Sequence, residues 1–533
     1  MREAKTTRRS DLDALRAIAM LLGIVLHAIL AYFPFPWPVQ DAHPQRWLAF
    51  VYAAIHGFRM PLFFLLSGFF TSMVLERRGL RSLVWQRVLR IALPLAVGML
   101  TIIPLNNAVM SWAVGQQARA TAERSPLAGA IVAGDIAAVR AATQSGVDAA
   151  GEDGDAYLPL VLAALTGNSS VVAVLLDAGA DINRAGPDGG TALHAAGYMG
   201  EAEIVQFLLA HGADPTIRDS GGMRPLEWLA SSVDIAHLAR RFLGGQPRSV
   251  EEISQGREQI RELLVPVTPP GAKASPLDTL AEAYQTYLAS PRFRIPLWVG
   301  GGVHLFASEV FDHLWFLWYL CWLVGVFSIT HVCGIGPRGG GRWWLPAVSV
   351  VAQAGMSAPF GPDTALGLMP LPHLLLFYGC FFWFGASTYV LDGQETKLGQ
   401  RWKISLPLAF LVLLPAGLAT VGHRPWAIVL QPAFAWTASL GLIGGFRRFI
   451  AGPSTALRWL ADSSYWMYLV HLPLVIAFQA LLLRMDWPAA VKILCVMSLT
   501  VAVSLTTYRC CVRYTLIGFV LNGPRRRDGG PPR

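Results

Sequence analysis

Charge is scarce in this chain: Asp, Glu, Lys and Arg make up only 14% of the 533 residues, whereas 54% are hydrophobic. The mean hydropathy of +0.45 lies above the usual range of soluble globular proteins. This combination excludes an ordinary soluble enzyme. It predicts a polytopic membrane protein.

Cysteine is also rare, and the spacing of the cysteines indicates no metal site. The six cysteines form neither a Cys-x-x-Cys pair nor a spacing typical of Cys/His zinc ligands. All of them lie in or beside apolar segments, so we expect no disulfide framework and no metal site. The residues are Cys321, Cys333, Cys380, Cys495, Cys510 and Cys511.

Acidic residues are fewer than basic ones, 34 against 43, which gives a net charge of +9. The basic residues form short clusters between apolar segments rather than one continuous patch. Such clusters are typical of cytoplasmic loops of membrane proteins and not of a nucleic-acid-binding face. We therefore expect no nucleic-acid partner.

Ten apolar stretches are long enough to cross a bilayer as helices. The predicted fold class is thus all-α, a polytopic membrane protein of about ten transmembrane helices. The fifth stretch is the weakest, because it is short and contains Gln353. The stretches are 12–33, 48–75, 87–112, 311–333, 343–360, 370–391, 404–422, 426–446, 464–484 and 489–514.

The loops between these stretches predict a direction for the chain. The basic segment Met1–Arg9 leads into the first stretch without a small-residue cleavage site, so we interpret that stretch as a retained span and not a signal peptide. If this N-terminus is cytoplasmic, every inside loop carries a basic cluster, while the short outside loops carry few basic residues. The inside loops are 76–81, 334–342, 392–403 and 447–458.

A long polar insertion follows the third span and repeats with a period of 33 residues. The segments Thr191–Ala196 and Leu208–Asp214 closely resemble the ankyrin repeat. Three repeats are regular, and a fourth is degenerate, with Val233 in place of the turn glycine, as in a capping repeat. The recurring glycines are Gly134, Gly167 and Gly200, and Gly146, Gly179 and Gly212.

These features divide the chain into five predicted parts, with an ankyrin-repeat solenoid inserted into the membrane region. By the loop charges, the solenoid lies outside the cytoplasm. The parts are a first membrane part with three spans (1–117), the ankyrin repeats (118–245), a linker with one possible helix around 277–289 (246–304), a second membrane part with about seven spans (305–520) and a basic tail (521–533).

The first span carries Arg16 and His27 with ten residues between them. This spacing places both side chains almost on one helix face, about 16 Å apart along the axis. Because ionisable groups are costly inside a bilayer, we expect both to face a protein-lined or water-lined cavity. The alternative is a snorkelling arginine beside a structural histidine.

Other spans contain similar polar residues. His56 and Arg59 share a helix face in the second span, although Arg59 can also be an interfacial arginine on a packing helix. Arg87 and Arg90 share a face at the start of the third span and can grip a phosphate, but positive-inside charge explains them as well. Two further histidines, either of which can be packed in an aromatic belt, are His313 and His471.

Four motifs in this order resemble the acyltransferase 3 superfamily, and the closest likeness within it is to the glucans biosynthesis protein C group. The likeness covers about 10–115 and 305–520, whereas the 33-residue repeats depart from the usual family pattern. The motifs are Leu12–Arg16 followed by His27, His56–Phe64, His313–Leu317 and Tyr465–Pro473, and Arg87 with Arg90 matches an Arg-x-x-Arg pair of some members.

The resemblance implies transfer of an acyl group from cytoplasmic acyl-CoA, such as acetyl- or succinyl-CoA, to an acceptor outside a bacterial inner membrane. That acceptor is often a sugar hydroxyl, which points to O-acetylation or succinylation of an envelope glycan, as in glucan biosynthesis. No cofactor is expected to stay bound. From the membrane depths of the residues we expect His27, Arg59 and His313 to be catalytic and Arg16, Arg87 and Arg90 to hold the CoA phosphates.

His27 is expected to act as the general base on the acceptor hydroxyl, while a covalent acyl-histidine remains open. Arg59 or His313 would stabilise the oxyanion or orient the sugar. Asp312 is the one carboxylate that we can name as a candidate for orienting His27.

Two other classes of function compete with this interpretation. A transporter would line its substrate path with Arg16 and His27, although the sequence shows no inverted repeats to favour one. A membrane-anchored binding protein would make the ankyrin repeats the active part, and so many buried ionisable groups would then exceed what anchoring needs. Ankyrin repeats usually bind protein, so we expect a protein partner, with the acceptor glycan as the alternative ligand.

Overall fold

The computed structural model describes residues 9–523 apart from 34, 36, 148–157, 187, 220–221, 230–232, 244–247, 269–275, 289, 298–300, 307, 309, 337–340, 359, 365–366, 394–397, 422, 451 and 453. The basic tail expected at 521–533 lies outside these residues from 524 onward. Within the described chain the strands are limited to a short antiparallel hairpin of β1 (Arg294–Leu297) and β2 (Gly301–His304). The all-α fold class is therefore confirmed.

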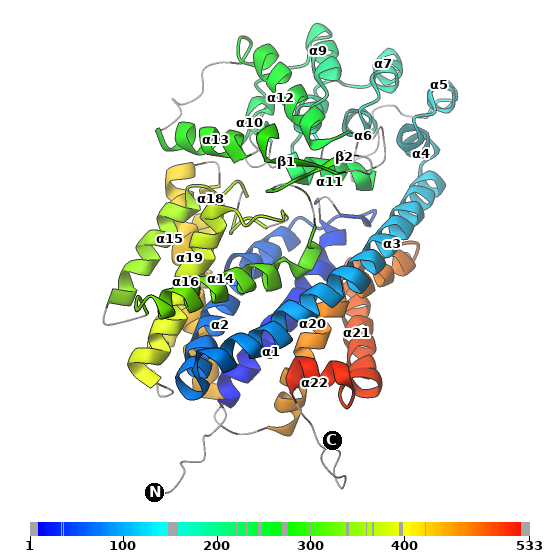
Figure 1. Cartoon of the computed structure of the whole chain (residues 1–533). Helices are drawn as coiled ribbons and strands as arrows, with labels where there is room; N and C mark the ends of the chain where they lie inside the picture. The colour runs from blue at the N-terminus through cyan, green and yellow to red at the C-terminus, as the bar shows by residue number, and fades with distance from the viewer. Residues whose placement is uncertain are drawn as a thin grey trace, which may run out of the picture.

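A bundle of long apolar helices forms the larger body of the molecule (Figure 1). In the described part of the chain, its helices are interrupted or joined by the π-helical turns η2 (Val88–Ala92), η7 (Leu408–Leu413) and η8 (Tyr508–Val512). The helices are α1 (Ser10–Ile29), α2 (Leu48–Arg87), α3 (Leu93–Arg124), α14 (Trp315–Val332), α15 (Leu345–Gln353), α16 (Pro372–Asp392), α17 (Trp402–Pro407), α18 (Leu414–Ala419), α19 (Arg424–Phe449), α20 (Thr455–Leu482), α21 (Ala489–Thr507) and α22 (Leu516–Asn522).

Eight helical runs of the described chain are long and apolar enough to cross a membrane. The run 48–124 holds two membrane helices, because Gly79 leaves the helical conformation at φ 75° and turns the chain. The stretch 343–360, expected as the fifth span, forms only the nine-residue α15. At 1.5 Å per residue such a helix is about 13 Å long, too short to cross a bilayer alone.

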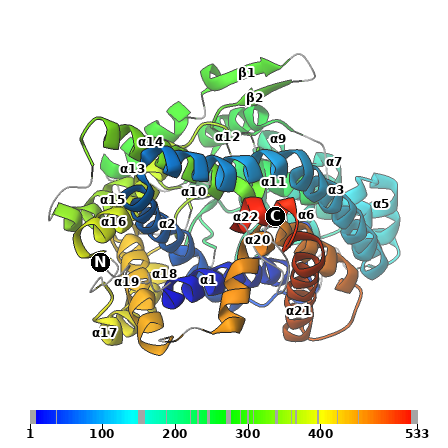
Figure 2. The same ribbon diagram turned by 60° about the horizontal axis from the view of Figure 1, so that its bottom comes forward.

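α2 lies at the centre of the bundle, packed against α1, α16 and α19. Two glycines let α2 and α16 approach backbone to backbone: Gly68 lies directly against the carbonyl of Phe382, and Gly385 against that of Leu65. Small residues at such contacts are typical of helix pairs in membranes. Seen from the end at which α1 begins, α1 lies between α2, α19 and α20 (Figure 2).

The inserted segment forms a stack of paired helices, as the 33-residue period predicted. The first helix of each regular repeat ends at a glycine in the left-handed conformation, with φ 68° at Gly134, 76° at Gly167 and 73° at Gly200. The pairs are α4 (Pro126–Ala133) with α5 (Ile136–Gln144), α6 (Pro159–Thr166) with α7 (Ser169–Asp177), α8 (Ala192–Met199) with α9 (Ala202–Ala210), and α10 (Pro225–Trp228) with α11 (Val233–Leu243).

The segment expected as a linker, 246–304, differs from that expectation. It contains α12 (Val250–Leu264), which packs against α8 and α9 with Gly256 lying directly on the backbone of Gly200. Arg257 of α12 donates a hydrogen bond of 3.1 Å to the carbonyl of Tyr198. α12 therefore belongs to the repeat stack. The helix expected around 277–289 is present as α13 (Pro276–Leu288).

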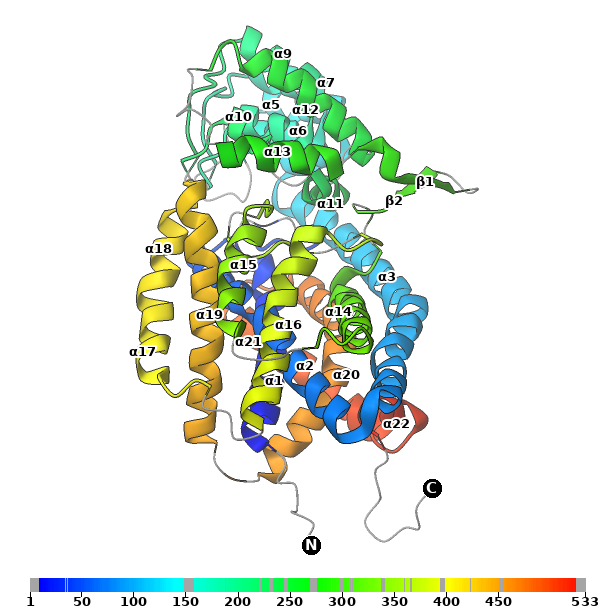
Figure 3. The same ribbon diagram turned by 60° about the vertical axis from the view of Figure 1, so that its left-hand side comes forward.

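The ankyrin stack lies at one end of the helix bundle, and α22 lies at the opposite end (Figures 1 and 3). α3 runs almost directly into α4, so the boundary expected at 117/118 falls inside α3. α13 returns the chain to the bundle, where the Tyr284 hydroxyl lies 3.3 Å from Nδ1 of His373 on α16. We call the end of the bundle next to the ankyrin stack the ankyrin end. The opposite end, at which α1 begins, is called the arginine end after the arginines described below.

Candidate active site

α1 carries Arg16 and His27 on one unbroken helix, and both side chains face α20. Arg16 donates to the carbonyl of Ala461 at 3.4 Å, and the ring of His27 lies against that of His471. Eleven residues of rise separate the two side chains by about 16 Å. The predicted common face is therefore present, and α20 is the element that it faces.

Three histidines from distant parts of the chain meet in the bundle, and we call them the histidine cluster: His27 of α1, His313 of the short 3-10 helix η4 (Asp312–Leu314), and His471 of α20. The ring centroids of His27 and His471 are 5.2 Å apart, and those of His471 and His313 are 5.3 Å apart. His471 thus lies between the two histidines that the sequence singled out. The sequence favoured His471 less, because a lone histidine in an aromatic segment is usually a packing residue.

Pro473 explains how His313 is held. A proline inside a helix has no N–H to offer the carbonyl four residues before it, here that of Leu469. The Nε2 atom of His313 lies 3.0 Å from this carbonyl oxygen and is its donor. The Tyr468 hydroxyl donates in turn to the His313 carbonyl at 2.8 Å. α20 therefore fixes both the backbone and the ring of His313.

Trp37 and Gln479 support His27 from the ankyrin end. The indole of Trp37 stacks on the His27 ring at a centroid distance of 5.8 Å and donates to Oε1 of Gln479 at 2.8 Å. The buried Gln479 amide donates to the carbonyls of His27 at 3.0 Å and Ala28 at 3.1 Å. This contact pattern was not expected, since the sequence gives no sign that Trp37 folds back over α1.

Arg59 of α2 reaches the same region. Its guanidinium lies directly against Gly23, one helical turn before His27, in space that any side chain at Gly23 would occupy. The Nε atom of Arg59 is buried and has no hydrogen-bond partner within the described chain. The ionisable groups that interact most favourably with its charge are the tyrosines Tyr468, Tyr52 and Tyr378. A buried cation in such surroundings is suited to bind an anion.

The neighbouring His56 is a packing residue and not part of the histidine cluster. It stacks on Tyr52 at a centroid distance of 5.1 Å, and its Nε2 donates to the carbonyl of Pro362 at 3.0 Å. Gly361 lies close against the His56 ring. The loop before α16 is thereby attached to the Arg59 face of α2.

Asp312 does not orient His27. Its backbone has the positive φ of 41°, rare for a non-glycine residue, and its Oδ2 accepts a hydrogen bond of 3.0 Å from Asn106 of α3. The Nδ1 atom of His27 is buried and has no hydrogen-bond partner among the residues that the structure describes. The suggestion of Asp312 as an orienting carboxylate is therefore wrong, because the turn before α14 directs this carboxylate towards α3.

The predicted donor-binding arginines gather at the arginine end. Arg87 donates to the Thr71 hydroxyl at 2.9 Å, and Arg90 lies in the π-helical turn η2. Arg90 interacts electrostatically with Arg16, and also with the exposed Arg78 of the basic loop 76–81. π-helical turns inside α-helices are frequent at functional sites. We call Arg16, Arg87 and Arg90 the arginine cluster.

One face of α20 connects the two clusters. The Tyr465 hydroxyl donates to the carbonyl of Arg90 at 2.6 Å, and the Tyr465 and Tyr468 rings lie 6.4 Å apart. Tyr468 and His471 then complete the row at a spacing of three residues, which places all three on one side of the helix. This spacing was visible in the sequence and is the signal that would have given His471 more weight.

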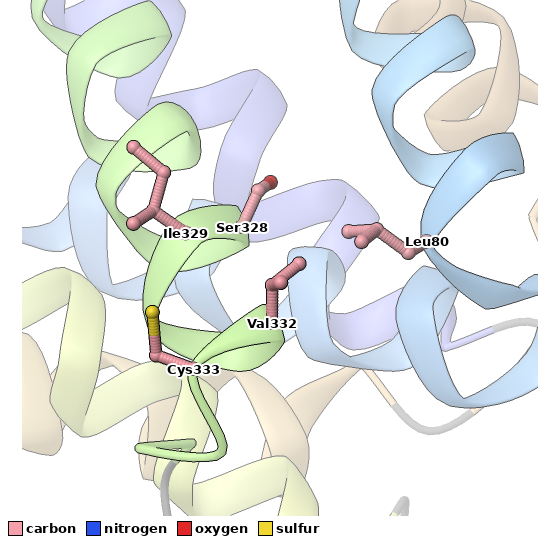
Figure 4. A pocket seen from close by; sticks show the side chains of 5 residues that line it. All are labelled: Leu80, Ser328, Ile329, Val332 and Cys333. Carbon is pink, nitrogen blue, oxygen red and sulfur yellow. The ribbon is translucent and has the colours of Figure 1, made fainter.

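A cavity of about 240 Å³ lies elsewhere, between α14 and the Gly79 turn (Figure 4). Leu80, Ile329, Val332 and Cys333 line it with Ser328, whose hydroxyl donates to the carbonyl of Val324. It contains no residue of either cluster. In the described part of the chain, no three His, Cys, Asp or Glu side chains are arranged to hold a metal ion.

A family model described as an acyltransferase domain matches residues 9–126 and 281–509, well over half of the chain. The chain belongs to the acyltransferase 3 family. A second model, for three copies of the ankyrin repeat, matches residues 127–219, inside the interruption of the first match. This acyltransferase is thus a multi-pass membrane protein with inserted ankyrin repeats, and the expected family and enzyme class are confirmed.

Curated relatives carry the same likeness over a shorter range. The Glucans biosynthesis protein C of Escherichia coli strain SMS-3-5 / SECEC and that of Escherichia coli O157:H7 strain EC4115 / EHEC are each 41% identical to the chain over 105 residues. That range is 20% of this chain and 26% of each relative. The chain therefore matches about a quarter of the length of these relatives.

Proposed function

We propose that this acyltransferase moves an acyl group from acyl-CoA, bound at the arginine end, to a hydroxyl group of an envelope glycan that enters from the ankyrin end. The membrane is the bacterial inner membrane, and the arginine end faces the cytoplasm. The observation that carries this proposal is the attachment of both clusters to the same pair of helices, α1 and α20, about 16 Å apart.

The arginine cluster would hold the phosphates of the donor. Guanidinium groups bind phosphate through paired, charge-assisted hydrogen bonds, and several arginines together repel one another unless an anion lies between them. Arg87 and Arg90 interact in this way, and Arg16 lies close to Arg90. The pantetheine arm of acetyl- or succinyl-CoA would then run along the α20 face past Tyr465 and Tyr468 towards His27.

His27 would act as the general base. It takes the proton of the acceptor hydroxyl while the hydroxyl oxygen attacks the thioester carbonyl carbon, and the carbonyl oxygen becomes an oxyanion. Arg59 lies next to His27 and would stabilise this charge, with His313 orienting the acceptor. When the carbon–sulfur bond breaks, the proton on His27 passes to the leaving thiolate. The products are an ester and free CoA.

The ankyrin repeats would serve the acceptor side. They lie at the end of the bundle remote from the arginine cluster, where Trp37 and Gln479 flank His27. Ankyrin stacks usually present a protein-binding surface, so a protein that delivers the glycan is the partner that we propose. Bilayer lipid surrounds the bundle.

The test is the variant His27→Ala, expressed at the level of the original chain, with acyl groups on envelope glycans measured by mass spectrometry. We expect loss of the added acyl mass. His331→Gln is the control, because His331 is exposed at the end of α14, and its acyl signal should stay unchanged. Full acylation by the His27→Ala variant would contradict the proposal. The proposal would also be contradicted if unmodified glycan were exported by the original chain but not by the His27→Ala variant.

A further inference from the structure

Among the described residues, no carboxylate binds Nδ1 of His27, although a carboxylate commonly orients a catalytic histidine in this way. If Nε2 is the atom that accepts the hydroxyl proton, neutral His27 carries its own hydrogen on Nδ1, and that N–H needs an acceptor. Nδ1 is buried without a hydrogen-bond partner in the described chain, and Asp312 is engaged by Asn106. Leaving such a donor unpaired costs about 1–3 kcal/mol.

His471 offers the missing acceptor. Its Nδ1 lies 2.8 Å from the carbonyl oxygen of Tyr468, and because a carbonyl only accepts, Nδ1 of His471 must carry the hydrogen. Its Nε2 therefore has a free lone pair. This Nε2 is buried and has no hydrogen-bond partner among the described residues, and the neighbouring ring of His27 carries an equally unpartnered Nδ1.

We infer that His471 accepts a hydrogen bond from Nδ1 of His27 and so fixes the tautomer and orientation of the base, as a positioning residue. The ring centroids are 5.2 Å apart with a tilt of 42°, a separation that a small ring rotation or one bridging water closes. This inference rests on the role proposed for His27.

The surroundings explain why a neutral acceptor occupies this place. The ionisable groups that interact most strongly with His27 are His471, Arg59, His313 and His56, all of them basic. A carboxylate here would pair with Arg59 and remove the cation that the oxyanion needs. Neutral His471 leaves Arg59 free of a counter-ion, and its hydrogen bond strengthens once His27 becomes an imidazolium. The interaction thus favours the transition state over the ground state.

His313 is not the acceptor, although its Nδ1 is also unpartnered within the described residues. Its ring contacts His471 and Tyr468, and its Nε2 is bound to Leu469. The middle position of His471 makes it the neighbour of His27. Its own partner, the carbonyl of Tyr468, belongs to the same helix and keeps the ring direction fixed.

Two substitutions of one residue separate this role from packing. His471→Gln keeps a polar acceptor near the position of Nε2, whereas His471→Asn keeps a donor for the Tyr468 carbonyl but has no atom at the Nε2 position. In the full-length protein in lipid nanodiscs, we expect His471→Asn to lower kcat about tenfold with little change in the KM for acyl-CoA. His471→Gln should recover most of this loss. Equal rates for the Asn variant and the original chain would overturn the inference.

A chemical probe tests the hydrogen bond without any acyl donor. Diethyl pyrocarbonate modifies neutral imidazole, and the rate at His27, read by peptide mass spectrometry, should fall about tenfold in His471→Asn but not in His471→Gln. The exposed His331 gives the reference rate. If the original chain transfers no acyl group but the modification rate at His27 follows this pattern, only the proposed function is refuted. If the original chain transfers acyl groups and His471→Asn leaves the modification rate at His27 unchanged, only the role of His471 is refuted.

If His471→Asn does not fold, the original chain still decides the question. Nitrogen-15 NMR of histidine-labelled protein should show the His471 signal as the tautomer with hydrogen on Nδ1, assigned by its loss in His471→Gln. A His471 ring with hydrogen on Nε2 cannot accept from His27 and would overturn the inference.

Discussion

Gly23 shows how single residues shape the site. It lies one turn before His27, and the Arg59 guanidinium occupies the space that a Cβ would need. We predict that Gly23→Ala displaces Arg59 and lowers kcat about 100-fold, since a shift of about 1 Å in a catalytic group can cost that much. The measurement is the rate of acyl transfer by purified protein in nanodiscs.

Gly325 provides the matched control for Gly23. It lies in the membrane helix α14 with open space where a Cβ would stand. Gly325→Ala should therefore keep the original rate and yield. If both alanine variants lose activity equally, the effect comes from helix packing in general and not from Arg59.

The arginine cluster gives a second prediction for single residues. Arg87→Lys and Arg90→Lys keep the charge but lose the forked pair of donors that matches a phosphate. We expect the KM for acyl-CoA to rise about tenfold in each, with kcat nearly unchanged. Steady-state kinetics over a range of acyl-CoA concentrations measure both constants. Arg81→Lys, at an exposed position beyond the Gly79 turn, should leave both constants as they are.

The sequence was enough to find most of the residues that meet in the candidate site. Arg16, His27 and Arg59 stand out because ionisable side chains are rare and costly in apolar helices. His471 was underrated, since its significance depends on its ring lying between those of His27 and His313. This position follows from a contact between α1 and α20, far apart in the chain, which spacing along one helix does not encode.

Among the elements, α20 organises the site through Pro473. The proline frees the Leu469 carbonyl that holds His313. We predict that Pro473→Ala, which restores a helical N–H to this carbonyl, leaves the melting temperature equal or higher but lowers kcat about tenfold as His313 loses its exclusive partner. Thermal unfolding and acyl transfer are measured on the same sample.

Pro432 of α19 is the control for this change, because it also interrupts a buried membrane helix. Pro432→Ala should keep the activity of the original chain. A fall in activity for Pro432→Ala as large as that for Pro473→Ala would show that helix kinks in general, and not the Leu469 carbonyl, support the reaction.

A buried ion pair ties α21 to the segment after α1. Nζ of Lys492 lies 2.6 Å from Oδ2 of Asp41, and both side chains are 6% exposed. Lys492→Met should lower the free energy of unfolding by about 3–5 kcal/mol, because it leaves a buried carboxylate unpaired. Arg484→Met removes the exposed pair with Glu123 and should cost at most about 1 kcal/mol. Equal losses, measured by denaturant unfolding in detergent micelles, would contradict this reasoning.

Elements were predictable where local chemistry decides them. The 33-residue glycine step predicted the helix pairs, since left-handed C-caps strongly favour glycine. The short α15 and the docking of α12 were not foreseen, because both depend on what lies beside them. α12 looks like polar linker sequence until Gly256 and Arg257 meet the backbone of α8.

For the whole molecule, the decisive property is which end of the bundle faces the cytoplasm. The start of α1 and the ankyrin stack lie at opposite ends (Figure 1). Acyl-CoA is cytoplasmic, so the proposed function requires the arginine end to be inside and the repeats outside. Ser145 is exposed at the end of α5 and offers a labelling position within the repeats.

We predict that Ser145→Cys, in a chain whose native cysteines are changed to serine, reacts with a membrane-impermeant maleimide in intact spheroplasts. Arg81→Cys, exposed at the other end, should react only after lysis. Basic loops lie at the arginine end, and positive charges favour the cytoplasmic side, so both outcomes follow from one orientation. The reverse labelling pattern would place the arginine cluster outside the cell, away from acyl-CoA. The histidine cluster would then have to serve a donor without CoA, and the proposed reaction would be wrong even if His27 proved essential.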